Sequence, residues 1–342
     1  GEKLLMVKKL IFILFIAATG LKAQDIHFTQ WMFSPLNLNP GETGRFEGDY
    51  RIVGNFRSQW GATMGKQYKT LGMSYDRVFS AYGQDFSAGL QFDNDRSSIG
   101  NLTQNKLMLS GGYNKLVKGN YLSGGIQIGL LHKGVDPNAY NYPVQWDVDQ
   151  GEFSNNSLSN MENFSKTNDY SFDLNLGVGW ARQIGDKLFP EVGLAWYHLN
   201  KPSESFFNDS ETFSLRQVYN AKFNYKLNDR YTISPNVMYM YQNKAQDLVL
   251  GVIGKMRMDV NKAKIDEVFV GMNFRDGYKR NYDAANLIIG AVRQEWQVGI
   301  SYDINVSGLS SVTHYRGAFE LSVIYIAQSS EPSIYNVPCD RY

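Results

Sequence analysis

Apolar and polar residues alternate with a period of two over long stretches of the chain after Glu47. The clearest stretch runs from Tyr170 to Trp180. Its even-numbered positions are apolar or aromatic, and its odd-numbered positions are Ser171, Asp173, Asn175, Gly177 and Gly179. Because successive side chains of a strand point to opposite faces, this pattern predicts a strand with one apolar and one polar face. Aromatic residues stand at both ends of the apolar face, which is typical of a transmembrane β-strand of ~9–11 residues.

The same alternation predicts a series of fourteen strands. Their ranges are 47–60, 66–78, 85–94, 103–116, 120–132, 169–182, 188–199, 213–226, 230–242, 246–258, 265–275, 284–293, 295–306 and 316–327. The connections between them alternate in length, and the longest is 133–168. Outer-membrane barrels have an even number of strands, short periplasmic turns and longer extracellular loops. We therefore predict an all-β fold, a transmembrane antiparallel β-barrel of about fourteen strands with both termini in the periplasm.

A soluble β-sandwich or β-propeller is the alternative fold, since it also has strands with one apolar face. The chain shows no internal repeat of blade length, which argues against the propeller. The long strands with aromatic ends favour the barrel over the sandwich.

The composition narrows the class of protein. Lys and Arg number 34 against 33 Asp and Glu, so the net charge near +1 offers no electrostatic footprint for nucleic acid. The single cysteine, Cys339, excludes a disulfide framework and a Cys-based zinc site. The mean hydropathy of −0.36 and the lack of an apolar run of ~18 residues exclude a helical membrane protein. Aromatic residues make up 14% of the chain, which suits a barrel in a lipid bilayer.

The first residues have the layout of a secretory signal peptide. The basic pair Lys8 and Lys9 precedes an apolar stretch over 10–18, and Ala23 offers a cleavage site. We expect export across the inner membrane, with the residues before Met6 as an upstream extension.

Four segments follow from these patterns. They are a signal peptide over 1–23, a periplasmic or plug segment over 24–46, the outer-membrane barrel over 47–327 and a periplasmic tail over 328–342. The segment over 24–46 contains Pro35, Pro40 and Gly41, and it either enters the lumen as a plug or stays below the barrel as a docking element.

Few residues could carry chemistry, and we expect no catalytic residue, metal or cofactor. The four histidines, His27, His132, His198 and His314, have no metal-ligand spacing. His198 lies near Ser203, but the chain has no nucleophile turn of the G-x-S-x-G type, so a histidine at the barrel rim is the favoured interpretation.

Charged residues on the predicted inward faces are more informative, because charge facing lipid is costly and charge facing the lumen is not. They are Arg51, Arg57, Asp93, Asp173, Glu191, Arg257 and Asp303. Our default interpretation is that they fill the lumen with a ladder of ion pairs, and the alternative is that they line a pore.

Several segments are similar to those of a known family. Near the N-terminus these are Phe28-Thr29-Gln30, Ser34-Pro35-Leu36, Asn39-Pro40, Gly44, Gly48-Asp49-Tyr50-Arg51 and Arg57-Ser58-Gln59-Trp60. Further segments are 196–207, 299–310 and the terminal run Pro338-Cys339-Asp340-Arg341-Tyr342. Together they resemble the PorP/SprF family of type IX secretion system membrane proteins over essentially the whole mature chain. Glu42 and the stretch Ala318-Phe319-Glu320 depart from the family's pattern.

The resemblance implies a non-enzymatic outer-membrane barrel that serves protein secretion or gliding motility. Its implied partners are type IX secretion system subunits or a large, adhesin-like surface protein, besides the lipid bilayer. The implied docking residues are Gln30, Pro35, Asn39, Pro40, Gly44, Tyr50, Arg51, Arg57, Gln59 and Trp60 in the N-terminal part, and Pro338, Cys339, Arg341 and Tyr342 at the C-terminus. The alternative function is a solute channel of the outer membrane.

Overall fold

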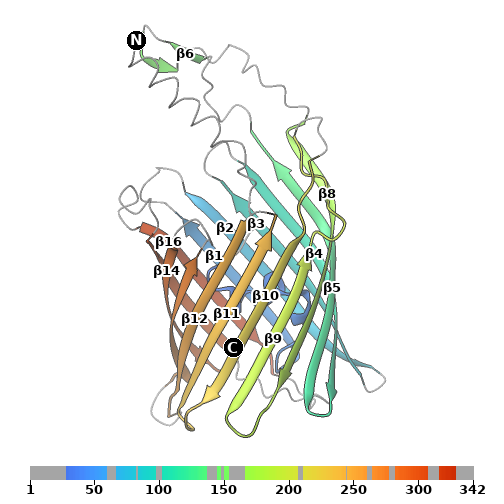
Figure 1. Ribbon diagram of the computed structural model, residues 1–342, viewed down its shortest axis with the longest axis vertical. Coiled ribbons are helices and arrows are strands. Elements are labelled where there is room, and N and C mark those ends of the chain that lie inside the picture. Colours follow the sequence, from blue (N-terminus) through green and yellow to red (C-terminus); the bar gives the residue numbers. More distant parts are fainter. Residues whose placement is uncertain are drawn as a thin grey trace.

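The computed structural model describes residues 28–59, 67–81, 84–97, 102–136, 145–147, 150–153, 166–206, 211–243, 245–259, 264–276, 282–306 and 316–328. Within these ranges, fourteen antiparallel strands close into a barrel (Figure 1). They are β1 (Tyr50–Gln59), β2 (Tyr68–Ala81), β3 (Gln84–Arg96), β4 (Thr103–Val117), β5 (Asn120–Gly134), β8 (Asn168–Arg182), β9 (Leu188–Tyr197), β10 (Arg216–Lys226), β11 (Tyr231–Gln242), β12 (Ala245–Arg257), β13 (Glu267–Asp276), β14 (Tyr282–Arg293), β15 (Trp296–Asn305) and β16 (Arg316–Ile326). None of the helices in the described ranges has the length and apolar character needed to cross a membrane.

The first and last strands close the barrel. Strand β1 pairs with β2 on one side and with β16 on the other, from Arg51 opposite Ile326 to Gln59 opposite Ala318. Each remaining strand of the barrel pairs with a neighbour on both sides, so the sheet has no free edge. The predicted fold, an antiparallel β-barrel of about fourteen strands, is confirmed.

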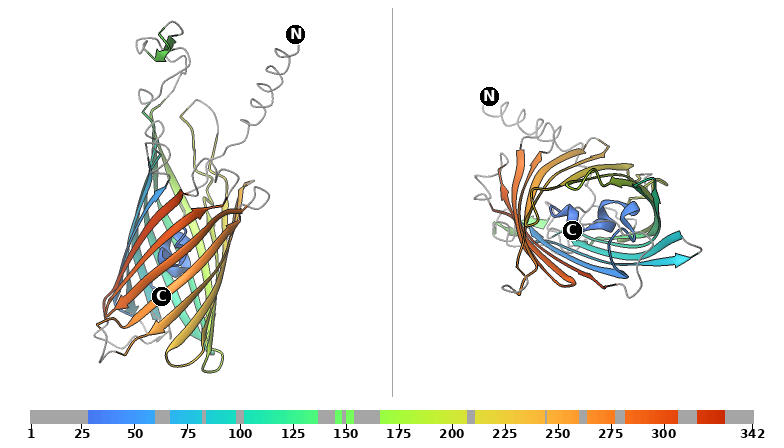
Figure 2. Two further views of the ribbon diagram at one scale, coloured as in Figure 1. Left: turned by 90° about the vertical axis from the view of Figure 1, so that its left-hand side faces the viewer. Right: turned by 90° about the horizontal axis from the view of Figure 1, so that it is seen from below.

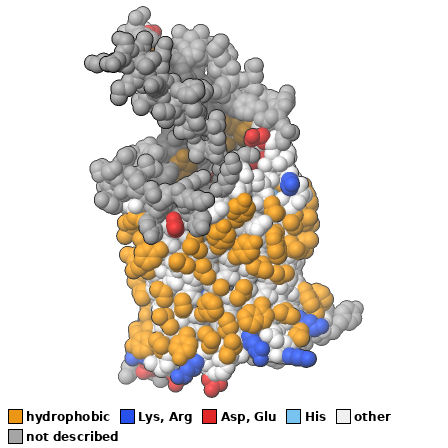
Figure 3. All heavy atoms as spheres, in the orientation of Figure 1, with side chains coloured by type: hydrophobic (Ala, Val, Ile, Leu, Met, Phe, Trp, Pro, Cys, Tyr) orange, Lys and Arg blue, Asp and Glu red, His pale blue; other side chains and the backbone are white. Residues whose placement is uncertain are grey.

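The two faces of the wall follow the alternation in the sequence. Along β8 the side chains of Asp173 and Asn175 are buried inside, whereas Phe172 and Leu176 are exposed on the outside. The outward side chains of the other strands form an apolar band around the barrel, bordered at its lower rim by charged residues (Figure 3). This band is the surface that a bilayer covers in a transmembrane barrel.

The connections differ between the two ends of the barrel (Figure 1). One end, here called the short-turn end, carries tight hairpins such as the one between β4 and β5. There Lys118 (φ 51°) and Gly119 (φ 79°) both adopt the left-handed conformation that a type I′ turn requires. The opposite end, here called the long-loop end, carries the connection between β5 and β8. The described part of that connection includes a small hairpin of β6 (Trp146–Asp147) and β7 (Glu152–Phe153).

Strands β9 and β10 are shorter at the long-loop end than the predicted ranges 188–199 and 213–226. His198 has a left-handed backbone (φ 60°), which ends β9 at Tyr197. The residues that follow form a hairpin of their own, in which Phe213 donates its N–H to the carbonyl of Pro202 at 2.9 Å. Strand β9 therefore ends at Tyr197 and β10 begins at Arg216, inside the predicted ends at 199 and 213.

A segment that precedes the barrel in sequence lies inside it. Residues 28–46, here called the plug, contain η1 (Trp31–Phe33), α2 (Pro35–Leu38) and η2 (Pro40–Glu42). Seen along the barrel, these short helices lie within the ring of strands (Figure 2). All plug residues are buried except Asn37, which is half-buried. The plug therefore occupies the lumen, one of the two places considered for the segment over 24–46.

Candidate functional site: the plug and the inner wall

The first residues of the plug bind a carboxylate of the wall near the long-loop end. The N–H groups of Thr29 and Gln30 donate to the two carboxylate oxygens of Glu320 at 2.8 and 2.9 Å. Arg57 forms ion pairs with Glu320 and with Asp303, the latter at 3.2 Å. Thr29 also donates its hydroxyl to Asp303 at 3.0 Å. These groups are buried, so each charge is balanced by an opposite charge and by hydrogen bonds.

Gln30 has its side-chain amide satisfied at both ends. Its Nε2 donates to the hydroxyl of Ser301 at 2.9 Å, and its Oε1 accepts from the hydroxyl of Ser322 at 2.8 Å. Since Gln30 is entirely buried, these bonds fix its orientation within the lumen. Gln30 thus connects the plug to β15 and β16.

A turn in the middle of the plug rests on a row of glycines in the wall. The glycines are Gly112, Gly125 and Gly177, which lie opposite one another on β4, β5 and β8. A Cβ on Gly125 would lie 2.0 Å from the carbonyl oxygen of Pro40, and one on Gly177 would lie 1.9 Å from Oδ1 of Asn39. Any side chain at these two wall positions would displace the turn.

Asn39 holds this turn together and joins it to the wall. Its Oδ1 accepts from the N–H of Gly41 at 2.7 Å, which caps η2, and its Nδ2 donates to the carbonyl of Val178 at 3.0 Å. Pro40 occupies the first turn of η2, where a missing N–H costs no helix hydrogen bond. The Asn39-Pro40-Gly41 turn therefore packs directly against the glycine row, where the wall has no side chains.

The end of the plug is fixed by a buried pair on β1 and β2. Arg51 binds Asp76 through two parallel hydrogen bonds of 3.0 and 2.7 Å, and both side chains are entirely buried. Arg51 also donates to the carbonyl of Glu42 at 2.9 Å. Asp76 in turn accepts from the N–H of Gly44 at 2.8 Å. Gly44 has φ 71° and its Cβ would lie 2.2 Å from that of Ser87, so only glycine suits this position.

A second charged group lies beside this end of the plug. Arg45 pairs with Glu42 at 2.7 Å and with Glu191 on β9 at 2.9 Å. Glu191 also pairs with Lys222 on β10 at 2.8 Å. The plug and the wall therefore share one network of alternating charges.

The other side of the plug is apolar. Trp31, Met32, Phe33 and Leu38 pack in one cluster with inward-facing side chains of the wall. The wall members are Val53, Ala195, Tyr197, Val218, Met238, Met240, Val249, Ile253, Phe269, Ile288, Val292, Ile324 and Ile326. A cavity of about 20 Å³ remains between the plug and strands β10 and β11, close to the ~10–15 Å³ that one water molecule needs. The expected ladder of ion pairs is thus only part of what fills the lumen.

Most of the predicted inward charges lie where the alternation places them. Asp93 is entirely buried and pairs with Lys106 at 3.8 Å, and Arg57, Glu191 and Asp303 are buried in the networks above. Arg257 has the inward register but lies exposed at the end of β12.

The structure brings together most of the N-terminal residues that the family resemblance singled out. Gln30, Asn39, Pro40, Gly44, Arg51 and Arg57 all take part in the contacts between plug and wall. Pro35 is buried at the start of α2, and the half-buried Gln59 accepts from Arg57 at 3.2 Å. Tyr50 lies on the outer face at the short-turn end, against Tyr75 and Tyr325. Trp60, Pro338, Cys339, Arg341 and Tyr342 lie outside the described residues.

Sequence reasoning missed two wall carboxylates that hold the plug, Asp76 and Glu320. Both lie on the inward register of their strands, between outward-facing residues. That position was the available signal, since an inward charge needs a partner inside the lumen.

His198 belongs to the loop above β9. Its Nδ1 lies 2.9 Å from Oδ1 of Asp173, both side chains are entirely buried, and its ring lies against Phe213. Ser203 instead pairs with Thr212 across the hairpin. The geometry gives His198 a role in ending β9 and holding this hairpin. In the described part of the chain, no three His, Cys, Asp or Glu side chains gather in a way that could hold a metal ion.

Solved structures with a similar fold include a toluene transporter. The toluene transporter TodX of Pseudomonas putida is 10% identical, with 85% of this chain and 92% of that chain covered and a TM-score of 0.51. The toluene transporter TbuX of Ralstonia pickettii is 10% identical, with 85% and 91% covered and a TM-score of 0.49. The likeness to TodX shows the fold alone.

No curated protein matches the sequence. Residues 20–325, nearly the whole chain, match the family described as type IX secretion system membrane protein PorP/SprF. This match covers the plug, the glycine row and every strand of the barrel except the last residue of β16. The chain therefore belongs to the PorP/SprF family of type IX secretion system membrane proteins.

Proposed function

We propose that this outer-membrane barrel is a closed docking protein of the type IX secretion machinery. It binds secretion-system subunits or one dedicated, adhesin-like surface protein, and it supports the export or surface attachment of that cargo. Family membership supports the link to type IX secretion. The observation that carries the docking role is the seated plug, which leaves the two ends of the barrel as the surfaces available to partners.

The plug is held in ways that favour a permanent seat. Wall carboxylates bind its backbone at one end, the glycine row holds its middle, and the Arg51–Asp76 pair holds its other end. Releasing it would take the N–H groups of Thr29 and Gln30 from the buried Glu320 and the N–H of Gly44 from the buried Asp76, which is costly.

The orientation follows the rule for outer-membrane barrels, with the short-turn end in the periplasm and the long-loop end outside the cell. Secretion-system subunits then meet the short-turn end, where the C-terminal candidates Pro338, Cys339, Arg341 and Tyr342 follow β16. The buried residues of the family motif hold the plug in place, and the seated plug in turn shapes the short-turn end.

A cargo protein would meet the long-loop end. The hairpin between β9 and β10 is braced there against β5 and the start of β8. Lys133 pairs with Glu204, and Ser205 donates its N–H to Asp169 at 3.2 Å. Lys133 also lies over the ring of Phe213 at 4.5 Å. The described residues of this hairpin are thus braced by the wall, and a braced segment offers a preformed surface to a partner.

The test is a comparison of surface and secreted proteins in cells with and without this gene. The deletion strain is complemented with the wild-type chain, or with a chain in which Gly-Ser residues replace 203–212. Loss of one large surface protein, restored only by the wild-type chain, is expected for a dedicated cargo partner. General loss of exported proteins would instead identify a core secretion component. Unchanged surface and secreted proteins would overturn the proposal.

The alternative function is a solute channel. TodX is described as a toluene transporter, but its likeness to this chain is one of fold. A channel would require the plug to leave the lumen or to open a path beside it, so a substantial conductance of the wild-type barrel would favour this alternative.

A further inference from the structure

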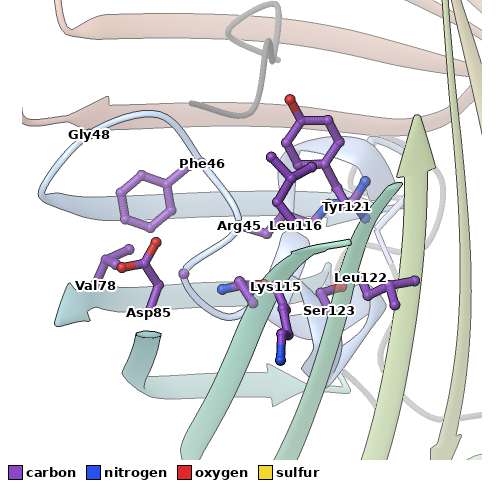
Figure 4. Close-up of a pocket in the computed structure, with 12 residues that line it drawn as sticks. Arg45, Phe46, Gly48, Val78, Asp85, Lys115, Leu116, Tyr121, Leu122 and Ser123 are labelled. Atoms are coloured by element: carbon purple, nitrogen blue, oxygen red, sulfur yellow. The ribbon is translucent and has the colours of Figure 1, made fainter. Parts of the chain in front are cut away.

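A small pocket opens at the short-turn end, between the end of the plug and strands β2 to β5 (Figure 4). Its volume is about 40 Å³, some three times the ~10–15 Å³ that one water molecule needs. Most of its lining is apolar, from Phe46, Val78, Leu116 and Tyr121, and Arg45, Asp85 and Lys115 also line it. Leu116 is 37% exposed at the pocket mouth, whereas Phe46 is buried at its base. The pocket therefore suits one aliphatic side chain that enters from the short-turn end.

The polypeptide leaves the barrel beside this pocket. Gly48 belongs to the pocket lining, and a Cβ on it would lie 2.5 Å from the carbonyl oxygen of Ala327. Asp49 donates its N–H to that carbonyl at 3.0 Å, and Ala327 donates its N–H to Tyr50 at 2.9 Å. The last residues of β16 are thus fixed against the pocket rim.

Fourteen residues follow the described chain, in the order Ser-Ser-Glu-Pro-Ser-Ile-Tyr-Asn-Val-Pro-Cys-Asp-Arg-Tyr over 329–342. Val337 stands nine positions after Gln328, which allows a reach of up to about 30 Å at ~3.3 Å for each residue. The chain can therefore turn back to a pocket that begins beside Ala327. The adjoining Pro338 lowers the entropy that this segment would lose on becoming ordered.

We propose that the pocket is the seat of this chain's own C-terminal tail, with the side chain of Val337 between Phe46, Leu116 and Tyr121. The tail is the favoured occupant because its tether to β16 holds it at a high effective concentration beside the pocket. Seating Val337 presents Pro338–Tyr342 on the short-turn face. The inference deepens the proposed function. It rests on that function only where it assumes that a partner uses Pro338–Tyr342.

The test uses Cys339, the single cysteine of the chain, as a position probe. In an extended segment, Cys339 lies on the same side as Val337 and about 7 Å from it. Leu116→Cys places a second thiol at the pocket mouth. Leu227→Cys places one on the exposed turn between β10 and β11, at the same end of the barrel. Each variant is purified, oxidised and analysed for an intramolecular disulfide to Cys339, and Cys339→Ser versions show the background.

If the tail is seated, the disulfide to Cys339 should form at least about tenfold faster with Leu116→Cys than with Leu227→Cys. A seated tail holds Cys339 in a fixed position beside residue 116, whereas a tail held only by its tether is not fixed beside either position. Adding Val337→Asp to Leu116→Cys should remove that preference. Equal rates at the two positions would overturn the proposal, and so would a disulfide rate that Val337→Asp leaves unchanged. A disulfide from Leu116→Cys to another protein in cells, with none to Cys339, would also overturn it and assign the pocket to a partner.

This measurement uses the purified chain without partners. Its outcome therefore stands apart from that of the comparison of surface and secreted proteins, which tests the docking role.

Discussion

Glu320→Ala is the most direct way to loosen the plug without touching it. Glu320 accepts the backbone N–H groups of Thr29 and Gln30, and it pairs with Arg57. In the variant, Arg57 keeps its ion pair with Asp303, so the wall retains a partner for that charge. The substitution therefore mainly weakens the attachment of the first residues of the plug to the wall.

The expected size of the effect follows from the two hydrogen bonds that disappear. A hydrogen bond to a charged group contributes about 1.5–3 kcal/mol, so the two together contribute about 3–6 kcal/mol to seating. Since ~1.4 kcal/mol corresponds to a factor of ten, local opening of this end should rise about a hundredfold or more. The glycine row and the Arg51–Asp76 pair still hold the rest of the plug.

Hydrogen exchange of the barrel in lipid nanodiscs measures this opening. Peptides over 28–34 should exchange about a hundredfold faster in Glu320→Ala than in the wild-type chain, and peptides over 39–46 should change less. Phe319→Ala, on the outer face of the same strand, is the matched control and should leave both regions unchanged. Equal exchange over 28–34 in Glu320→Ala and the wild-type chain would refute the assigned anchor. Peptides of the wall show whether the barrel itself remains folded.

Two further substitutions test the other anchors. Gly177→Leu should push Asn39 from the wall and raise the rate of proteolytic cleavage within the plug, whereas Gly54→Ala, where a Cβ meets no atom within 4 Å, should leave that rate unchanged. Asp76→Asn should remove the carboxylate charge that faces the buried Arg51 and lower the free energy of unfolding by about 3–5 kcal/mol, which denaturant titration of the barrel measures. An unchanged midpoint in that titration would contradict the assigned role of the pair.

The strands could be predicted from the sequence because both faces of the wall are imposed by their surroundings. The outer face meets an apolar medium and most of the inner face meets polar groups, so alternation marks each strand. The end of β9 could not be predicted, because the left-handed backbone of His198 leaves no mark on the alternation.

The plug contacts were harder to predict. Its helices have three or four residues each, too few to show a helical period. Glu320 binds backbone groups about 290 positions away in sequence, which no local pattern records. Met238 and Met240 face the lumen, where the pattern of the other strands predicts polar side chains. They pack in one cluster with Trp31 and Leu38 of the plug, which explains their apolar character.

Gly125 on β5 makes room for the carbonyl of Pro40, a group that comes from the plug. The absence of a side chain was visible in the sequence, but the segment that uses the space was not.

The closed lumen is the centre of this account, and single-channel recording in planar bilayers tests it most directly. The wild-type barrel should conduct little, and a variant that lacks residues 28–46 should conduct at least about tenfold more, as an emptied barrel of this size holds water. A wild-type barrel that conducts as readily as the variant without the plug would contradict the account and favour a solute channel.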